Sequence, residues 1–322
     1  MIIVTGAAGF IGSALLWKLN KEGIGDIILV DEELTAEKRP NINNKKYKDF
    51  IEKEKFLALI SSDKLGKKAD AIFHLGACSS TLVADEAYFK KNNVEYSKKL
   101  AEYALKNNIR FIYASSAATY GDGSFGYSDE DETTYKLKPL NAYGRSKQEF
   151  DLWVLKESLG DKVVGLKYFN VFGPNEYHKN DMRSVIAKSF DEVVRTKKMR
   201  LFKSHKKEYK DGEQKRDFIY VKDAVDATYH FLDGARGKNG IYNVGTGLAR
   251  TWNDLALALF AALGMPQKIE YFDMPENLRD KYQYFTQADT AKLRVCDYKN
   301  DFTSLEEAVR DYAGFLKNKT YL

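Results

Sequence analysis

The stretch "TGAAGFIG" (residues 5–12) decides the fold of this chain. A short apolar run, "IIVTG" (2–6), leads into it, and a segment with apolar residues three and four positions apart (10–23) follows it. Gly6, Gly9 and Gly12 give the spacing G-x-x-G-x-x-G, which allows a tight turn and a close approach of the backbone to a pyrophosphate. The helix that follows offers free N–H groups and its positive dipole end to the phosphates. A strand, this turn and a helix in that order predict a dinucleotide-binding unit.

The alternation of short apolar runs with helical patterns continues along the chain. Further runs lie at 26–31, 69–77, 110–116 and 163–170. Strands that alternate with helices form a parallel sheet that is buried on both faces. We therefore predict an α/β fold, a Rossmann-type doubly wound parallel sheet with a smaller C-terminal α/β substrate domain. Residues 1–170 would form the dinucleotide-binding domain and residues 171–322 mainly the substrate-binding domain.

Three further segments of the second half have a predicted structure. A return strand near 240–247 is expected to join the large sheet. The polar stretch at 203–217 is expected to be a loop, and residues 251–264 form an amphipathic pattern that predicts a helix packed in the core.

The composition excludes several classes of protein. The 322 residues are 44% hydrophobic and 13% aromatic, which is too apolar for a disordered chain and sufficient for a large core. Lys and Arg (51) exceed Asp and Glu (46) only slightly, so the charge does not favour nucleic acid. Two cysteines and four scattered histidines predict neither structural disulfides nor a metal site. With no apolar run of about eighteen residues and no leader before the first strand, we expect a cytoplasmic protein without a membrane partner.

Charged residues after the second run bear on the choice of cofactor. Asp31 ends that run, nineteen residues after Gly12, where an acid usually binds the adenosine ribose hydroxyls. Asp31 and its neighbour Glu32 would repel a 2′-phosphate and favour NAD, whereas Lys38 and Lys53 would attract it and favour NADP. The local residues leave NADP and NAD open.

The stretch "NAYGRSKQEF" (141–150) places Tyr143 and Lys147 one turn apart on one face of a predicted helix. Ser116 ends the fourth run, at the sheet edge where ligands bind in such folds. A free tyrosine titrates near 10, so ionising it near pH 7 costs roughly 4 kcal/mol. An ammonium one turn away and a cationic nicotinamide can together supply an energy of that order in a shielded cleft. Such a pair can act as a general acid/base with a pKa near the working pH, but its spacing alone does not distinguish it from two neighbours on a solvated helix face.

The glycine turn, the acid, the serine and Tyr-x-x-x-Lys, in that order, resemble the extended short-chain dehydrogenase/reductase superfamily. Longer stretches over essentially the whole chain resemble one family, the ADP-L-glycero-D-manno-heptose 6-epimerases. They are "FHLGACSST" (73–81), "KNNVEYSK" (91–98), "YASSAATYG" (113–121), "PLNAYGRSK" (139–147), "YFNVFGPNEYHK" (168–179), "KRDFIYVKD" (215–223) and "YQYFTQAD" (282–289).

This resemblance implies an isomerase that inverts C6 of ADP-D-glycero-D-manno-heptose. In this family a bound nicotinamide cofactor, usually NADP, removes the hydride from C6, leaves a 6-keto intermediate and returns the hydride to the opposite face. The resemblance also implies a homo-oligomer and a role in lipopolysaccharide core biosynthesis. Glu32 departs from the asparagine that is usual in the family, so NAD stays an alternative cofactor.

Carried over position by position, the resemblance implies a role for each site residue. Tyr143 would be the acid/base, Lys147 would hold the nicotinamide ribose, Ser116 would bind a substrate oxygen, and Lys179 would be the second acid/base on the other side. The cofactor positions are Gly6, Gly9, Phe10, Ile11, Gly12, Asp31, Glu32, Lys38, Lys53, Leu75, Gly76, Ala77, Cys78, Ser79, Asn92, Lys147, Val171 and Lys179. The substrate positions are Asn170, Asp181, Lys188, Phe202, Arg216 and Tyr282, where an arginine fork suits a diphosphate.

Other functions stay open beside this one. A 4,6-dehydratase places Asp-Glu directly after the strand-four hydroxyl, where this chain has Ala117 and Ala118. A UDP-hexose 4-epimerase or a related nucleotide-sugar oxidoreductase would share the Tyr-x-x-x-Lys pair, and the "GACSS" and "HK" segments disfavour it. A non-catalytic dinucleotide-sensing protein would typically lose the tyrosine or the lysine. Nucleic-acid binding has only the lysine-rich stretch at 203–217 behind it.

Overall fold

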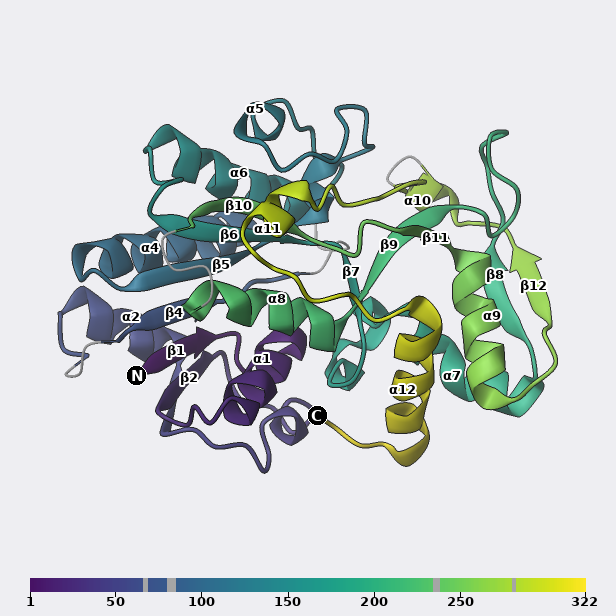
Figure 1. The fold of residues 1–322 in the computed structure, drawn as a ribbon, viewed down its shortest axis with the longest axis horizontal. Coiled ribbons are helices and arrows are strands. Elements are labelled where there is room, and N and C mark those ends of the chain that lie inside the picture. The colour runs from purple at the N-terminus through teal and green to yellow at the C-terminus, as the bar shows by residue number, and fades with distance from the viewer. Residues whose placement is uncertain (66–68, 80–84, 234–237, 280–281) are drawn as a thin grey trace.

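A seven-stranded parallel sheet forms the centre of the protein (Figure 1). The computed structural model describes residues 1–65, 69–79, 85–233, 238–279 and 282–322. The strand order is β10-β6-β5-β4-β1-β2-β3, and every neighbouring pair is parallel. The strands are β1 (Ile2–Thr5), β2 (Ile27–Asp31), β3 (Asp49–Glu52), β4 (Ala71–His74), β5 (Arg110–Ser116), β6 (Val163–Tyr168) and β10 (Gly240–Val244). The doubly wound α/β fold predicted from the sequence is confirmed.

The predicted strands and the observed strands differ at a few places. All five predicted runs contain a strand, and the return strand is present as β10, which pairs in parallel with β6. The sequence did not indicate β3, because this edge strand is short and its side chains are half-buried or exposed. The predicted loop at 203–217 is wrong at its end, where β9 begins at Lys215. The domain boundaries stay a prediction.

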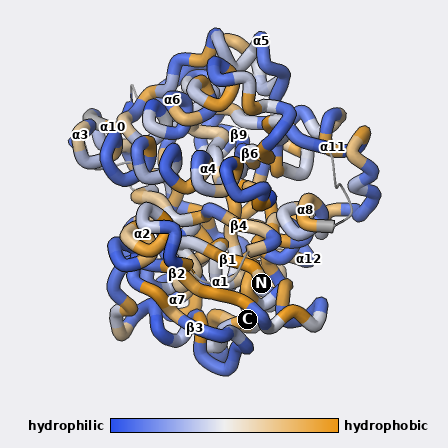
Figure 2. Tube along the Cα trace, turned by 90° about the vertical axis from the view of Figure 1, so that its left-hand side faces the viewer, coloured by the Kyte–Doolittle hydropathy of each residue, from blue (hydrophilic) through white to orange (hydrophobic). Residues whose placement is uncertain are grey.

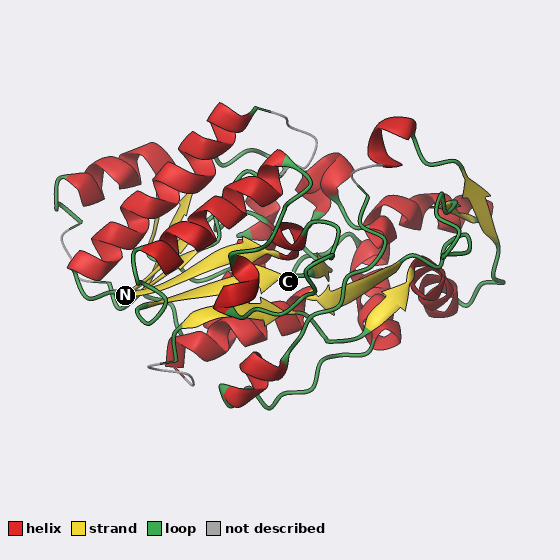
Figure 3. Ribbon diagram, turned by 90° about the horizontal axis from the view of Figure 1, so that it is seen from above, coloured by secondary structure: helices red, strands yellow, loops and turns green. Residues whose placement is uncertain are grey.

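Helices cover both faces of the sheet (Figure 3). Along β1, Ile2 and Val4 belong to one hydrophobic core, and Ile3 belongs to the other together with Met1 just before the strand, because successive side chains of a strand point to opposite faces. The first face is covered by α1 (Phe10–Lys21) and α8 (Val221–Asp233), and the second by α2 (Lys53–Ser61), α4 (Tyr96–Lys106) and α6 (Ala142–Lys156). Figure 2 shows the hydrophobic colours of β1, β2 and β4 inside a largely hydrophilic periphery.

Two small sheets lie on the right of Figure 1, together with helices that include α7 (Val185–Thr196), α9 (Trp252–Leu263) and α12 (Leu305–Asn318). One sheet has the order β11-β9-β7 and the other the order β12-β8. Their strands are β7 (Asn170–Phe172), β8 (Met199–Phe202), β9 (Lys215–Tyr220), β11 (Ala249–Thr251) and β12 (Ile269–Phe272). The helices α7, α9 and α12 pack on one another.

The predicted core helix at 251–264 is confirmed as α9. Thr251 caps its first turn in a capping box with Asp254, and Leu255 and Leu259 are buried. The shorter elements are η1 (Arg39–Asn41), α3 (Glu86–Phe89), η2 (Lys90–Glu95), η3 (Ala117–Tyr120), α5 (Asp131–Thr134), η4 (Tyr177–Met182), α10 (Glu276–Arg279) and α11 (Ala291–Val295). In the described parts of the chain, no helix is both long enough and apolar enough to cross a membrane.

Candidate active site

A cavity of about 1030 Å³ lies at the carboxyl ends of the central strands. It runs from the acidic end of β2 past the glycine turn to β8 and β9, so the large and the small sheets both contribute to its wall. The strand order reverses between β1 and β4, and ligands of doubly wound sheets bind at such a point. Every residue that the sequence assigned to the catalytic and cofactor sets lines this cavity.

The glycine turn is packed too tightly for side chains. A Cβ on Gly12 would lie 2.1 Å from the carbonyl oxygen of Gly6. Gly6 itself has φ +65°, and a Cβ there would lie 2.6 Å from the Cα of Gly76, in the loop after β4. The two loops therefore touch backbone to backbone, in front of the N-terminus of α1. A bare cradle at a helix N-terminus fits the pyrophosphate of a nicotinamide dinucleotide.

The two acidic residues at the end of β2 form hydrogen bonds and ion pairs with their neighbours. Asp31 is buried, and its carboxylate accepts from the backbone N–H of Ala8 at 2.8 Å, which fixes the glycine turn. The same carboxylate pairs with Lys38 at 3.0 Å. Lys53 lies 3.6 Å from Glu32 and donates to Asn92 at 2.6 Å. Each of the two acids therefore has a lysine beside it at this end of the cavity.

The loop after β4 is held by an asparagine that sequence reasoning missed. Asn93 is fully buried; its amide oxygen accepts from the N–H of Cys78, and its amide nitrogen donates to the carbonyl of Cys78, both at 2.9 Å. It also donates to the hydroxyl of Ser146 on α6, at 3.0 Å. The stretch "KNNVEYSK" contained this signal, but only Asn92 was assigned a role. Residues 80 and 81 of "FHLGACSST" lie outside the described residues.

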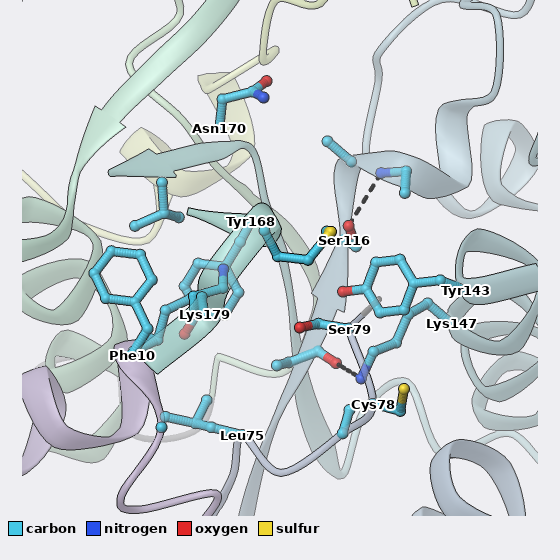
Figure 4. A pocket seen from close by; sticks show the side chains of 18 of the residues that line it. Phe10, Leu75, Cys78, Ser79, Ser116, Tyr143, Lys147, Tyr168, Asn170 and Lys179 are labelled. Carbon is cyan, nitrogen blue, oxygen red and sulfur yellow. Dashed lines mark hydrogen bonds between the residues drawn. The ribbon is translucent and has the colours of Figure 1, made fainter. Parts of the chain in front are cut away.

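The N-terminal half of α6 brings Tyr143 and Lys147 into the cavity wall. The side chain of Asn141 accepts from the N–H of Gly144 and so caps the helix just before Tyr143. Lys147 is only 5% exposed and donates to the carbonyl of Ala114 at 2.9 Å, and burial lowers the pKa of Lys147 to about 8. Figure 4 shows the hydroxyl of Tyr143 pointing toward Ser116.

Burial raises the pKa of Tyr143, and the Ser116 hydroxyl lowers it by a smaller amount. The activation expected from the sequence therefore requires positive charge close to the Tyr143 hydroxyl.

Lys179 lies on the opposite wall of the cavity, beside Phe10 (Figure 4). Its ammonium lies 5.2 Å from the centre of the Phe10 ring, and burial lowers the pKa of Lys179. Its segment follows β7, whereas Tyr143 belongs to α6. Two groups that can exchange protons therefore face one cavity from different elements.

The far end of the cavity holds a buried cation. Arg216 is 5% exposed, and its guanidinium lies 4.9 Å from the ring centre of Tyr282 and 5.7 Å from that of Trp252. Phe202 contacts Tyr282 edge to face. Within the described residues no carboxylate forms an ion pair with Arg216, and its one hydrogen bond there goes to the carbonyl of Lys215. A buried guanidinium in this state can receive an anionic ligand.

Two of the predicted substrate residues do not line the cavity. Asp181 and Lys188 are exposed, and the Lys188 ammonium folds back toward the carbonyl of Asp181 at 3.4 Å. Met182 and Arg183, between them, line the cavity instead. Asn170, Phe202, Arg216 and Tyr282 do line the cavity, and substrate contacts for all six residues stay a prediction.

Comparison with known proteins identifies the family. Residues 2–245 match the NAD dependent epimerase/dehydratase family. The chain is 52% identical to an ADP-L-glycero-D-manno-heptose-6-epimerase of Nitratidesulfovibrio vulgaris (strain Hildenborough), over 97% of this chain and 96% of that protein.

Two solved structures share the fold over nearly the whole chain. The crystal structure of Helicobacter pylori ADP-L-glycero-D-manno-heptose-6-epimerase has a TM-score of 0.81 at 29% identity and covers 98% of this chain and 96% of its own. A UDP-N-acetylglucosamine 4-epimerase from Methanobrevibacter ruminantium M1 also has a TM-score of 0.81, at 28% identity, and covers 99% of this chain and 98% of its own. The fold alone therefore does not separate these activities. The chain belongs to the NAD dependent epimerase/dehydratase family and is an enzyme that uses a nicotinamide cofactor.

Proposed function

We propose that this protein inverts C6 of ADP-D-glycero-D-manno-heptose to give ADP-L-glycero-D-manno-heptose. The observation that carries the proposal is the pair of acid/base groups, Tyr143 and Lys179, on opposite walls of one cavity. Inversion through a ketone needs a proton acceptor and a proton donor on the two sides of the reacting carbon. The 52% identity to a protein named as this epimerase supports the choice of substrate.

Each residue has one task in the proposed reaction. Tyr143 or Lys179 takes the proton from the C6 hydroxyl. After the ketone has rotated in the site and presents its other face, the other group returns a proton to the oxygen. A nicotinamide dinucleotide held by the glycine turn, Asp31 and Lys147 would supply reversible hydride transfer at C6, with no net redox change. Lys147 stabilises the ionised form of Tyr143 by its charge, and Ser116 orients the reacting oxygen.

The binding end of the cavity suits a nucleoside diphosphate. The buried guanidinium of Arg216 would pair with the diphosphate, and the rings of Tyr282 and Phe202 would cover the apolar parts of the ligand. A 4,6-dehydratase would need an acid directly after Ser116, and Ala117 and Ala118 provide none. The UDP-hexose 4-epimerase alternative keeps Tyr143 and Lys147, so it has to be tested with substrate.

Proton NMR in deuterated water with ADP-D-glycero-D-manno-heptose tests the proposal. We expect the C6 epimer to appear with its C6 proton retained, because the hydride returns from the cofactor without exchange. Deuterium at C6 would exclude direct hydride return. Absence of the epimer, in a sample that contains bound dinucleotide and turns over a UDP-hexose, would replace this function with that of a 4-epimerase.

We propose NADP as the cofactor. Lys38 and Lys53 lie at the end of the cavity where the adenosine ribose would bind, and each already compensates one of the two carboxylates there. A 2′-phosphate would gain from both ammonium groups. Lys38→Met should weaken NADP binding by about tenfold, roughly 1.4 kcal/mol, and leave NAD binding within about twofold. Equal losses for both dinucleotides by calorimetric titration would contradict this assignment.

Three further properties belong to the same proposal. We place the protein in the cytoplasm, since its described cysteines, Cys78 and Cys296, are free thiols. We expect a homo-oligomer, to be measured by light scattering of the purified protein. The product would supply a heptose for lipopolysaccharide core biosynthesis.

A further inference from the structure

The segment that carries Lys179 has a backbone that needs support. It leaves β7, passes through η4 and ends at Ser184, the N-cap of α7. Asn175 before it has φ +77°, and Asn180, next to Lys179, has φ +46° and ψ −119°. Positive φ values at non-glycine residues cost free energy and persist where surrounding contacts over-determine them. The contacts around this segment therefore decide where Lys179 lies.

The carboxylate of Glu176 closes the segment on itself. Glu176 is 1% exposed, and one of its oxygens accepts from the backbone N–H of Ser184 at 2.5 Å. The other oxygen accepts from the Ser184 hydroxyl at 2.6 Å and from the N–H of Gly173 at 3.4 Å. One buried side chain thus joins the residue before η4 to the N-cap of α7 beyond it.

The same carboxylate fastens the segment to α12. The hydroxyl of Tyr312, buried in the middle of that helix, donates to Glu176 at 2.9 Å. The neighbouring Tyr177 supports this attachment, because its hydroxyl donates to the carbonyls of Phe315 and Thr320, each at 3.1 Å. Helix α12 is rooted in the main hydrophobic core through Val309 and Leu316. The Lys179 segment is therefore attached to a well-packed helix that lies more than a hundred residues away in sequence.

Lys179 has few direct restraints of its own. Within the described residues its ammonium makes no hydrogen bond or ion pair, and it lies against the ring of Phe10. A long side chain of this kind reaches a defined point only if its backbone is fixed.

We propose that Glu176 is the positioning residue for Lys179: by joining both ends of the Lys179 segment to α12, it holds the second proton-transfer group on the wall opposite Tyr143. The inference rests on the proposed role of Lys179 in epimerisation. Glu176 is not among the residues that line the cavity, so it acts through the backbone it fixes and through its negative charge, which raises the pKa of Lys179. Tyr312→Phe leaves this charge in place and therefore separates the two effects.

Glu176→Gln tests this role with little change of volume. Glutamine replaces one acceptor oxygen by an NH2 group, which then faces the donors of Ser184 or Tyr312. At least one of the hydrogen bonds that hold the Lys179 segment is therefore lost. The measurement is the reduction of bound dinucleotide, followed by its near-ultraviolet absorbance after mixing with each C6 epimer separately. Lys179→Met defines which epimer depends on Lys179. The matched control is Glu306→Gln, which removes a surface carboxylate from α12 that pairs with Arg250.

We expect Glu176→Gln to slow cofactor reduction with the Lys179-dependent epimer by tenfold or more, since a displacement of about 1 Å can cost a hundredfold in rate. Reduction by the other epimer and the KM for both should stay within about twofold, and Glu306→Gln should behave as wild type. Tyr312→Phe, which removes one donor and keeps Glu176, should change the rates in the same direction by a smaller factor. If Glu176→Gln does not fold, the rates of Tyr312→Phe with the two epimers test the positioning role by themselves.

Three outcomes separate the explanations. Equal slowing with both epimers, together with a lower melting temperature, would show a merely structural role and overturn the inference. Unchanged rates in both Glu176→Gln and Tyr312→Phe would overturn it as well. If Lys179→Met itself leaves both half-reactions intact, the proposed role of Lys179 fails and the inference fails with it.

Discussion

Replacing Lys147 by methionine should make the protein more stable while it abolishes turnover. Lys147 is 5% exposed, and burial lowers its pKa from the ordinary 10.5 to about 8. At about 1.4 kcal/mol per pKa unit, this difference corresponds to about 3 kcal/mol that the folded state loses at pH 7 by keeping the ammonium charged. Methionine has a similar length and removes this cost. It also removes the hydrogen bond to the carbonyl of Ala114, which stabilises by about 1 kcal/mol. The free energy of unfolding should therefore rise by about 1–2 kcal/mol.

The pH dependence of this difference gives the sharper test. Between pH 8 and 10.5 the unfolded wild type still holds the Lys147 proton, whereas the folded wild type has lost it. Wild-type stability therefore rises with pH in this window relative to the variant. The advantage of Lys147→Met should be largest below pH 8 and should shrink or reverse by pH 10.5.

The assay is urea unfolding of both proteins at several pH values, with the dinucleotide removed from both, because a bound ligand adds its own stabilisation. A variant less stable than wild type at pH 7, by an amount that does not change with pH, would refute the reasoning.

Three other substitutions test separate parts of the structure. Tyr143→Phe should cut turnover by a few orders of magnitude and leave dinucleotide bound; near wild-type turnover in the NMR assay would remove the tyrosine from the mechanism. Gly12→Ala should abolish dinucleotide binding in equilibrium dialysis because its Cβ would collide with the glycine turn, whereas Gly314→Ala on α12, with open space around it, should bind normally. Lys167→Met should lower the free energy of unfolding by about 3–5 kcal/mol, because it takes the ion-pair partner, 3.2 Å away, from the fully buried carboxylate of Asp151 and leaves that charge only its hydrogen bonds from Tyr113 and Ser115; denaturant unfolding that matches wild type would contradict a charged pair at this site.

Local sequence patterns were sufficient to predict most strands of the fold and most of the residues proposed for the site. The glycine turn, Asp31 and the Tyr143–Lys147 pair each depend on spacing within a dozen or so residues or on the order of strands, and such signals are readable in one chain. The edge strand β3 lacked a signal because its half-exposed residues need no regular apolar pattern. The start of β9 was missed because a polar loop and a strand with Lys215, Arg216 and Asp217 look alike in sequence.

The residues that support the site could not be read from the sequence. Asn41 is buried and donates to the carbonyl of Ala8 in the glycine turn, and it also hydrogen-bonds His178, next to Lys179. Glu176 gains its importance only from Tyr312 on a distant helix. In sequence these are ordinary polar residues in loops, and their meaning arises from contacts between segments that only the tertiary fold brings together.

The return of the chain to its first sheet has a consequence for how the protein folds. The outer edge of β6 is covered by β10, and α1 is covered by α8, and both of these elements are made only after β7, α7, β8 and β9. During synthesis the edge of β6 and the apolar face of α1 therefore stay uncovered until β7, α7, β8 and β9 have been made. We expect the two parts of the molecule to mature together, and a chain cut near residue 170 to aggregate instead of folding by itself.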